Sequence, residues 1–372
     1  MIRIAIRADA SLQIGTGHVM RCLTLADALR RSGTADVAFV CRELTGNLIP
    51  YIRDRGYPVH ALPPAADLGA AVRSEAGLPP HAGWLEASWR EDAAQTIACL
   101  LAQAERPDWL VVDHYALDRR YESALRPYAG GVMAIDDLAD RPHDADLLLD
   151  QNLSDRPEAR YASRVDAGTR LLLGPRYALL REAFAERRPT VRRGGKAERL
   201  LVSFGGADRT GETLKALAAL EPMAEAGARL TVLAGQLNPM RERIERLCGR
   251  LPQTRFIAHT EDVAALMAEH DLAVGSGGST TWERGCLGLP AVIVATADNQ
   301  VALAEQAAQA GMIAYLGFAS DVSERRLREA VRRLAEDEDA LRRMSDAGMA
   351  AVDGLGAAAV AKEMRAWAES RK

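Results

Sequence analysis

The chain has 372 residues, of which 48% are hydrophobic and 26% are charged, a balance typical of a globular protein with about two domains. Its 47 Lys and Arg against 51 Asp and Glu give a net charge of -4 without a basic block, which argues against a nucleic-acid-binding protein. The N-terminal sequence is too short and too charged for a signal peptide, and no run of 18 apolar residues could span a membrane. Five scattered cysteines without metal-binding spacing fit reduced thiols, so we expect a cytoplasmic protein.

Short apolar runs alternate with longer helical stretches through the first half of the chain. The runs expected to be strands are Ile2–Arg7, Val37–Cys41, Trp109–Asp113, Val132–Asp136 and Leu147–Asp150. Helices are expected at Val19–Arg31 and Asp92–Ala104. Runs such as Leu110-Val111-Val112 are apolar without alternation, which is typical of strands buried on both faces of a parallel sheet. The alternation of strands and helices predicts a doubly wound α/β sheet.

A polar segment, Arg187–Lys196, interrupts this pattern, which then begins again. The later strands are expected at Leu200–Phe204, Leu230–Leu233, Arg255–Ala258, Leu272–Val274 and Ala291–Ala295. We therefore predict an α/β protein with two Rossmann-like domains, residues 1–186 and 197–356, joined by a linker at 187–196. A final helix, 357–372, is in a position to pack across the domain junction, and the Pro- and Ala-rich residues 63–80 are expected to form a surface excursion. Ligands of such sheets bind beyond the carboxyl ends of the strands, so two facing sheets would enclose one cleft.

The first candidate site follows the first strand. It contains Arg7-Ala-Asp9, then Gly15, Gly17 and His18 at the start of a helix, with Arg21 one turn later. Gly15, Gly17 and Arg21 are expected to contact the ligand directly. The glycines allow close approach of a ligand, and a helix N-terminus favours a phosphate or a developing anion. Our hypothesis is that His18 deprotonates a water molecule and that Asp9 orients its ring. A histidine hydrogen-bonded to local backbone is an equally weighted alternative.

Two further loops follow predicted strands, one in each domain. Asp113-His114-Tyr115 ends an apolar strand, where polar residues often line a site, although a turn packed by Tyr115 is the slightly favoured interpretation. Gly205 and Gly206, followed by Asp208, could cradle a phosphate. Many loops between strands and helices contain Gly-Gly, so this second signal is weak alone.

The strongest pattern is the segment Gly275–Glu283. Its small and hydroxyl-bearing residues offer many donors and little bulk, which suits a diphosphate; they are Ser276, Gly277, Gly278, Ser279 and Thr280. Glu283, about one turn into the following helix, could accept from ribose hydroxyls or could face solvent. Asn299 and Gln300 are candidate sugar or phosphate contacts. We expect no metal and no other cofactor, since the Asp pairs lie at strand boundaries and no EF-hand loop is present.

Taken in order, these blocks resemble a known family. Arg7-Ala-Asp9 with Ile14-Gly-Thr-Gly-His18 is similar to the opening motif of the UDP-sugar hydrolases of pseudaminic acid biosynthesis. Asp113-His114-Tyr115 and three later blocks resemble the same family; these are Asp136-Asp137, Gln151-Asn152 and Gly174–Arg181. Gly205–Asp208 and Gly275–Glu283 resemble the UDP site of its relatives, which include the peptidoglycan N-acetylglucosaminyl transferase. The resemblance runs in order from residue 1 to about residue 320.

The resemblance implies a GT-B architecture and a metal-independent reaction on UDP-2,4-diacetamido-2,4,6-trideoxy-β-L-altropyranose. Water would attack the anomeric carbon with inversion and release UDP. The family's histidine base falls on His18, its motif tyrosine on Tyr115 and its UDP-binding carboxylate on Glu283. Trp282 stands where some members carry a small amide, so the local contact with sugar or uracil differs. The implied partner is the small-molecule UDP-sugar, and other enzymes of the pathway remain open as partners.

In the resulting hypothesis UDP binds mainly the second domain. Its uracil would meet backbone near Arg255–Thr260, its ribose Glu283, and its phosphates the loops Gly205–Asp208 and Ser276–Thr280. The sugar would project toward His18. Three alternatives remain: a GT-B glycosyltransferase with a UDP-sugar donor, a nucleotide-sugar 2-epimerase, and a UDP-sugar-binding protein that would not need His18.

Overall fold

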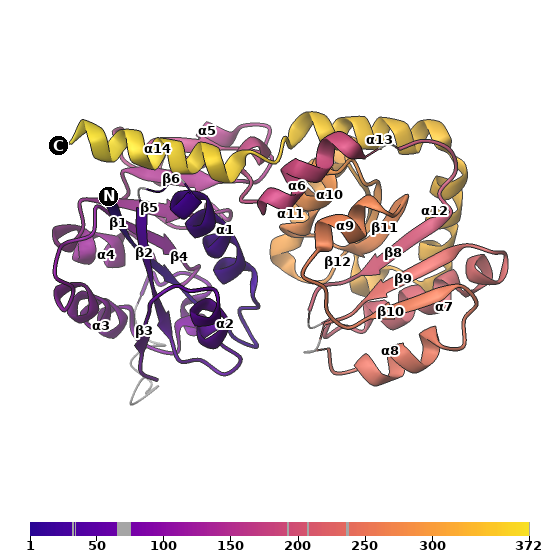
Figure 1. The fold of residues 1–372 in the computed structure, drawn as a ribbon, viewed down its shortest axis with the longest axis horizontal. Coiled ribbons are helices and arrows are strands. Elements are labelled where there is room, and N and C mark those ends of the chain that lie inside the picture. Colours follow the sequence, from indigo (N-terminus) through magenta and orange to yellow (C-terminus); the bar gives the residue numbers. More distant parts are fainter. Residues whose placement is uncertain are drawn as a thin grey trace. The chain divides into compact units, whose positions relative to one another are not determined.

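The computed structural model describes residues 1–31, 33, 35–64, 76–191, 193–206, 208–235 and 238–371, which form two compact units (Figure 1). The first unit comprises Met1–Leu179 and Leu355–Lys372, and the second comprises Leu180–Gly354. The chain therefore enters the second unit earlier than the polar segment 187–196 indicated, and it returns to the first unit near its end.

The first unit is built on a parallel sheet with the strand order β3-β2-β1-β4-β5-β6-β7 among the described residues. Its strands are β1 (Ile2–Ala8), β2 (Ala35–Arg42), β3 (Val59–Leu62), β4 (Trp109–Asp113), β5 (Gly131–Ile135), β6 (Leu147–Asp150) and β7 (Arg170–Leu173). Its α-helices are α1 (Gly17–Arg31), α2 (Ile49–Asp54), α3 (Trp89–Leu101), α4 (Arg119–Leu125), α5 (Pro157–Tyr161) and α14 (Gly356–Ser370). Short 3-10 turns occur at η2 (Ala82–Leu85), η3 (Arg126–Tyr128) and η4 (Pro175–Tyr177).

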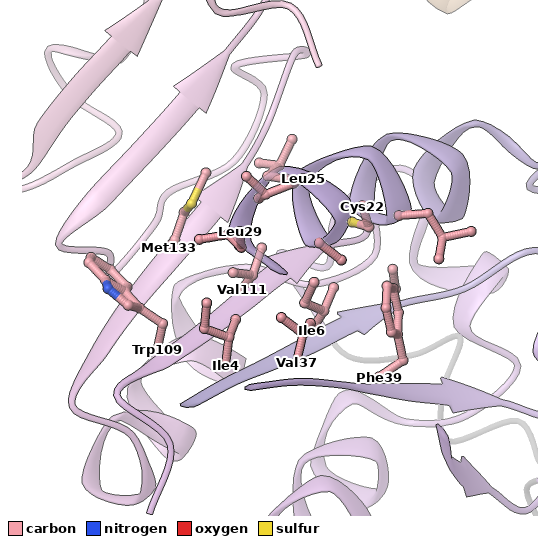
Figure 2. Close-up of a cluster of buried hydrophobic side chains, with 14 of the residues drawn as sticks. Ile4, Ile6, Cys22, Leu25, Leu29, Val37, Phe39, Trp109, Val111 and Met133 are labelled. Atoms are coloured by element: carbon pink, nitrogen blue, oxygen red, sulfur yellow. The ribbon is translucent and has the colours of Figure 1, made fainter. Parts of the chain in front are cut away.

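The core of this unit explains why its central strands are apolar without alternation. Figure 2 shows Leu25 and Leu29 of α1 packed over strand residues that include Ile4 and Val111. A separate cluster, which includes Ala5, Leu110, Val112 and residues of α3 and α4, covers the opposite face. Both faces of the sheet are therefore buried, as the sequence predicted.

The C-terminal helix α14 completes the first core. Met364 and Val360 are fully buried in the same cluster as α1, and the indole Nε1 of Trp109 donates to the Met364 carbonyl at 2.9 Å. The chain thus returns to the first unit to cover apolar surface that the first 179 residues leave exposed.

The second unit repeats the arrangement with a parallel sheet ordered β10-β9-β8-β11-β12-β13. Its strands are β8 (Arg199–Ser203), β9 (Arg229–Leu233), β10 (Thr254–Ile257), β11 (Leu272–Ser276), β12 (Ala291–Ala295) and β13 (Ala314–Phe318). Its α-helices are α6 (Glu182–Arg187), α7 (Glu212–Glu225), α8 (Arg241–Cys248), α9 (Val263–Ala268), α10 (Thr280–Cys286), α11 (Val301–Gln309), α12 (Glu324–Glu336) and α13 (Glu338–Ala351). The 3-10 turns η5 (Arg188–Thr190), η6 (Asp298–Gln300) and η7 (Ala319–Asp321) lie between them.

The segment expected to be a linker is held within the second unit. The Arg188 side chain donates to the carbonyls of Met349 and Val352 at the end of α13. The Arg193 side chain donates to carbonyls at the end of α9, including that of Met267 at 3.0 Å. Cations stabilise helix C-termini, so the arginines that made this segment look like a linker instead anchor it.

The chain order reverses at one point in each sheet. In the first, β1 lies between β2 and β4, and in the second, β8 lies between β9 and β11. Loops that leave the carboxyl ends of strands on either side of such a point diverge and leave room for a ligand. The loop after β1 and the end of β4 meet at the first point, and the loops after β8 and β11 meet at the second.

The strands predicted from sequence are all present, with ends shifted by at most two residues. Strands β3, β7 and β13 were missed; β3 and β7 have only four residues each, and most residues of all three strands are half-buried rather than buried along the whole strand. Most of the expected surface excursion, residues 65–75, lies outside the described residues. Among the helices that are described, none combines the length and apolar character needed to cross a membrane.

Replacing Met364 with alanine should destabilise the first unit, because it removes a fully buried side chain from the α14 interface. The expected loss is about 2–5 kcal/mol in the free energy of unfolding. The matched control is Lys362→Ala on the exposed side of the same helix, which should change it by less than about 0.5 kcal/mol. Denaturant unfolding followed by circular dichroism measures both, and equal losses would contradict the packing role of α14.

Candidate active site

The loop after β1 presents His18 in the first turn of α1. Its backbone turns tightly at Gly15, which has a φ of +80° and donates from its N–H to the Ser11 carbonyl at 2.9 Å. A Cβ placed at Gly15 or Gly17 would meet nothing within 4 Å, and both residues are exposed. Helix α1 begins at Gly17, as predicted. The loop before it is exposed at both glycines, so there is open space beside the first turn of the helix.

Asp113, the last residue of β4, holds the His18 ring in place. The Nδ1 atom of His18 lies 2.5 Å from Asp113 Oδ1. Arg21, one helical turn after His18, donates to both oxygens of the same carboxylate at 2.6 Å and to Asp137 at 2.8 Å. The four side chains therefore form one network of hydrogen bonds and Arg–Asp ion pairs at the point where the strand order reverses.

This network fixes the tautomer of His18. Although burial of Asp113 raises its pKa, Arg21 and His18 hold the pKa of this carboxyl well below its usual range. An ionised carboxylate can only accept, so the proton of the neutral imidazole lies on Nδ1. The lone pair on Nε2 is then available to take a proton from another molecule.

The structure corrects the predicted role of Asp9. Its carboxylate accepts from the Arg7 guanidinium at 2.6 and 2.8 Å and from the backbone N–H of Arg42 at 2.7 Å. It is fully buried and contacts His114 rather than His18. Asp113 takes the orienting role because β1 and β4 are neighbours, with Ala8 paired to Asp113.

Tyr115 lies against His18, with the two ring centroids 4.5 Å apart and the rings nearly perpendicular at 81°. Its hydroxyl donates to Asp137 Oδ1 at 2.6 Å. Burial and the neighbouring Asp137 raise the pKa of Tyr115 well above its usual range. Tyr115 therefore remains protonated and positions His18 through ring contact, while its hydroxyl stays bound to Asp137.

The neighbouring His114 is arranged differently from His18. Its side chain is 1% exposed, and its Nδ1 accepts from the Ala116 N–H at 3.0 Å. Burial lowers the pKa of His114 to about 3. His114 is thus a neutral, structural residue, which leaves His18 as the histidine whose second nitrogen can act as a base.

In the second unit, the loop after β8 has Gly205 at a φ of +84° and leaves Gly206 exposed. Asp208 does not point a free carboxylate at this loop. Its two oxygens accept from the backbone N–H groups of Glu212 and Thr213, each at 2.9 Å. Asp208 therefore caps helix α7, which corrects its predicted role as a ligand contact.

The loop after β11 is tightly packed at its base and open at its tip. A Cβ on Gly275 would lie 2.1 Å from the Ser203 carbonyl oxygen, so this position accepts only glycine. Arg284, a buried residue of α10, donates to the Ser276 carbonyl at 2.8 Å and holds the start of the loop in place. Gly278 has a φ of +104°, and the hydroxyl-bearing Ser279 that follows is exposed.

Glu283 is half-buried on α10, and burial raises its pKa. Among the described residues its carboxylate forms one ion pair, with Arg181 at 3.9 Å. Asn299 is exposed, whereas the Gln300 side-chain oxygen accepts from the Thr296 N–H at 2.9 Å. Gln300 is thus partly committed to its own loop.

Trp282 is fully buried in the second unit, and its indole N–H has no partner among the described residues. The side chain that departs from the family pattern is therefore a core residue rather than a surface contact for uracil or sugar.

Sequence reasoning missed three contributors to these sites. Asp113 and Asp137 were seen in motifs, but Asp113 was not assigned to His18, nor Asp137 to Arg21 and Tyr115; Arg181 was not linked to Glu283. Arg21 was expected to contact the ligand directly, yet its side chain is 8% exposed and its nitrogens are engaged by Asp113 and Asp137. Within the described ranges, no group of three or more His, Cys, Asp or Glu side chains is arranged to hold a metal ion.

Comparison with known proteins connects both units to glycosyltransferase-like proteins. Residues 204–359 match the sequence model of the glycosyltransferase family 28 C-terminal domain. The chain is 25% identical over 281 residues to the UDP-2,4-diacetamido-2,4,6-trideoxy-beta-L-altropyranose hydrolase of Campylobacter jejuni, covering 75% of this chain and 86% of that protein. The resemblance inferred from the ordered motifs is thereby confirmed.

Two other curated relatives are matched over only part of their length. The chain is 28% identical over 193 residues to the spore coat polysaccharide biosynthesis protein SpsG of Bacillus subtilis, covering 52% of this chain. It is 22% identical over 300 residues to the uncharacterized protein MJ1062 of Methanocaldococcus jannaschii, covering 79% of this chain. These matches span 57% and 55% of the two relatives, a little over half of each.

Solved structures of similar fold cover nearly the whole chain. MurG of Acinetobacter baumannii superposes with a TM-score of 0.67 at 16% identity, covering 98% of this chain and 99% of that one. MnaA of S. aureus, solved together with UDP, superposes with a TM-score of 0.64 at 13% identity, covering 99% and 97%. The protein thus has the GT-B fold with two Rossmann-like domains.

The tautomer of His18 can be tested directly. In the neutral form of the ring, long-range ¹H–¹⁵N NMR should show a protonated Nδ1 and an unprotonated Nε2, because ionised Asp113 accepts from Nδ1. In Asp113→Asn the amide can donate to Nδ1, so the proton should move to Nε2. His60 on β3 is the internal control, and a wild-type His18 that is protonated on Nε2 would refute the arrangement.

Proposed function

We propose that the protein hydrolyses UDP-2,4-diacetamido-2,4,6-trideoxy-β-L-altropyranose to UDP and the free sugar, with inversion at the anomeric carbon, as a step in pseudaminic acid biosynthesis. The observation that carries this proposal is the His18–Asp113–Arg21 arrangement, which leaves Nε2 of an oriented imidazole as a proton acceptor. The named Campylobacter jejuni relative, matched over most of its length, supports the choice of substrate.

In the proposed reaction, His18 Nε2 accepts a proton from water as the water oxygen bonds to the anomeric carbon. The bond from that carbon to the phosphate oxygen breaks, and UDP leaves with the electron pair. Asp113 stabilises the imidazolium that forms, and Arg21 keeps the carboxylate ionised and in place. Groups that are already oriented do not need to reorganise as charge develops, which lowers the barrier.

The second unit is proposed to bind the UDP moiety. Backbone N–H groups and hydroxyls in the loop from Ser276 to Thr280, together with the exposed Gly205-Gly206 turn, offer neutral donors to the diphosphate. Glu283 is proposed to accept from the ribose hydroxyls. No metal is required for this binding, because fixed donors stabilise the leaving group.

A glycosyltransferase with a UDP-sugar donor is the second candidate. It is favoured by the match of residues 204–359 to the family 28 C-terminal domain. The same base would then deprotonate an acceptor hydroxyl in place of water. UDP release in the absence of any acceptor separates the two, since a transferase would retain the donor intact.

The base assignment is tested by His18→Asn, assayed by UDP release from the altropyranose UDP-sugar without acceptor and with EDTA present. Loss of general-base catalysis should lower kcat by about 10²–10⁴-fold while the Kd for UDP stays within about twofold. His60→Asn, a substitution of a half-buried histidine on β3, is the matched control and should keep wild-type kcat. Full activity in His18→Asn would refute the assignment.

Glu283→Ala tests the ribose contact. A hydrogen bond to a charged group contributes about 1.5–3 kcal/mol, so we expect KM for the UDP-sugar and Kd for UDP to rise roughly tenfold or more. Glu305→Ala, which removes an exposed carboxylate from α11, should leave both constants unchanged. Calorimetric titration with UDP gives the Kd, and an unaltered value in Glu283→Ala would reject the ribose role.

A further inference from the structure

A cluster of aromatic rings adjoins His18 in the first unit. The Tyr115 ring contacts His18 and also lies close to His81 and Trp84. Its centroid is 5.3 Å from that of His81 and 5.8 Å from that of Trp84. His81 and Trp84 also contact each other, with centroids 4.5 Å apart. We call His81, Trp84 and Tyr115 the ring cluster.

The segment that carries His81 and Trp84 is fixed by its own anchors. Leu85 and Ala87 are buried among the residues that follow β4, including Ala116 and Leu117. Glu86 has a φ of 49°, a left-handed conformation that is uncommon for residues other than glycine. Strained backbone of this kind persists where the surrounding structure holds it, often beside a functional site. The two rings are therefore held in place, while both side chains remain half-buried.

The charges around the ring cluster neutralise one another. Asp137 accepts from Arg21 and from the Tyr115 hydroxyl. Arg141, which lies near the face of the Tyr115 ring, is 3% exposed and donates to Asp136 and Asp140. What the cluster offers a ligand is thus aromatic surface rather than a free charge, and this suits an uncharged group.

One polar atom in the cluster is left over. The Nδ1 of His81 is buried and makes no hydrogen bond among the described residues. Burial lowers the pKa of His81, so the ring is neutral near pH 7 and carries one donor and one acceptor nitrogen. Buried polar atoms in proteins almost always have a partner, so this nitrogen near the proposed base retains the capacity for one more hydrogen bond.

We propose that His81 and Trp84 recognise an acetamido group and the adjoining apolar edge of the sugar, an inference that rests on the proposed function. The acetamido group has both an N–H donor and a carbonyl acceptor, so it can pair with His81 Nδ1 in either tautomer. The rigid face of Trp84 packs against the methyl groups and C–H bonds of a deoxygenated sugar. The two side chains thereby select N-acylated deoxy-sugars over fully hydroxylated ones and position the anomeric carbon near His18.

The test separates sugar binding from catalysis by using His18→Asn as the parent. Calorimetry gives Kd values for UDP and for UDP-2,4-diacetamido-2,4,6-trideoxy-β-L-altropyranose. Adding His81→Phe or Trp84→Ala should raise the Kd for the UDP-sugar at least about tenfold. The Kd for UDP should stay within about twofold of the parent value. Trp84→Phe, which retains a ring face, should recover most of the affinity. His60→Phe and Trp89→Leu are the matched controls, and unfolding midpoints should be equal across the set.

An unchanged Kd for the UDP-sugar in both variants would overturn the inference. So would a parent that binds the UDP-sugar no more tightly than UDP, because the sugar would then contribute nothing. If Trp84 stacked on uracil instead, the affinity for UDP would fall in parallel, which also overturns it. Failure of the proposed function gives a different result: wild-type protein that releases no UDP, while these binding differences are still measured.

Discussion

The site in the first unit depends on a single buried carboxylate. Asp113 ends β4 with no exposure to solvent, and an unpaired charge in that position would be strongly destabilising. Arg21 supplies two donors and His18 supplies a third, so the charge is compensated by groups that come from one helix. The pairing of β1 with β4 brings that helix and that carboxylate together. Any change in this pairing would leave Asp113 without partners and His18 without orientation.

The sequence was sufficient for the fold wherever burial produced an unambiguous pattern. Central strands such as β4 and β12 are buried along their whole length, and their apolar runs predicted them to the residue. The missed strands β3, β7 and β13 all lie at sheet edges and are only partly buried, so burial left a weaker pattern there; of the four edge strands only β10 was predicted. The polar segment near Arg188 and Arg193 looked like a linker because composition alone does not show that these arginines bind helix carbonyls.

The motifs located the loops of the candidate site but did not identify the partners of each side chain. Asp9 is nearer than Asp113 to His18 in sequence, yet strand pairing places Asp113 next to the ring and directs Asp9 toward Arg7. Asp208 follows two glycines as a phosphate-loop residue would, but its carboxylate accepts hydrogen bonds from the first N–H groups of α7 instead. The partner of each carboxylate is decided by contacts between residues far apart in the chain or by nearby backbone donors. Neither can be recognised from the spacing of residues within a motif.

The two units differ in the chemistry they offer to a charged ligand. In the first, the arginines near the site are paired with carboxylates: Arg7 with the buried Asp9 and Asp92, and Arg21 with the buried Asp113 and the half-buried Asp137. None of these cations is free to attract a diphosphate, so the charges there serve to hold His18 and its surroundings in place. In the second, the loop from Ser276 to Thr280 carries no ionisable side chain and offers backbone and hydroxyl donors. In the proposed reaction, such fixed neutral donors would stabilise the charge that develops on the leaving diphosphate without a permanent salt bridge.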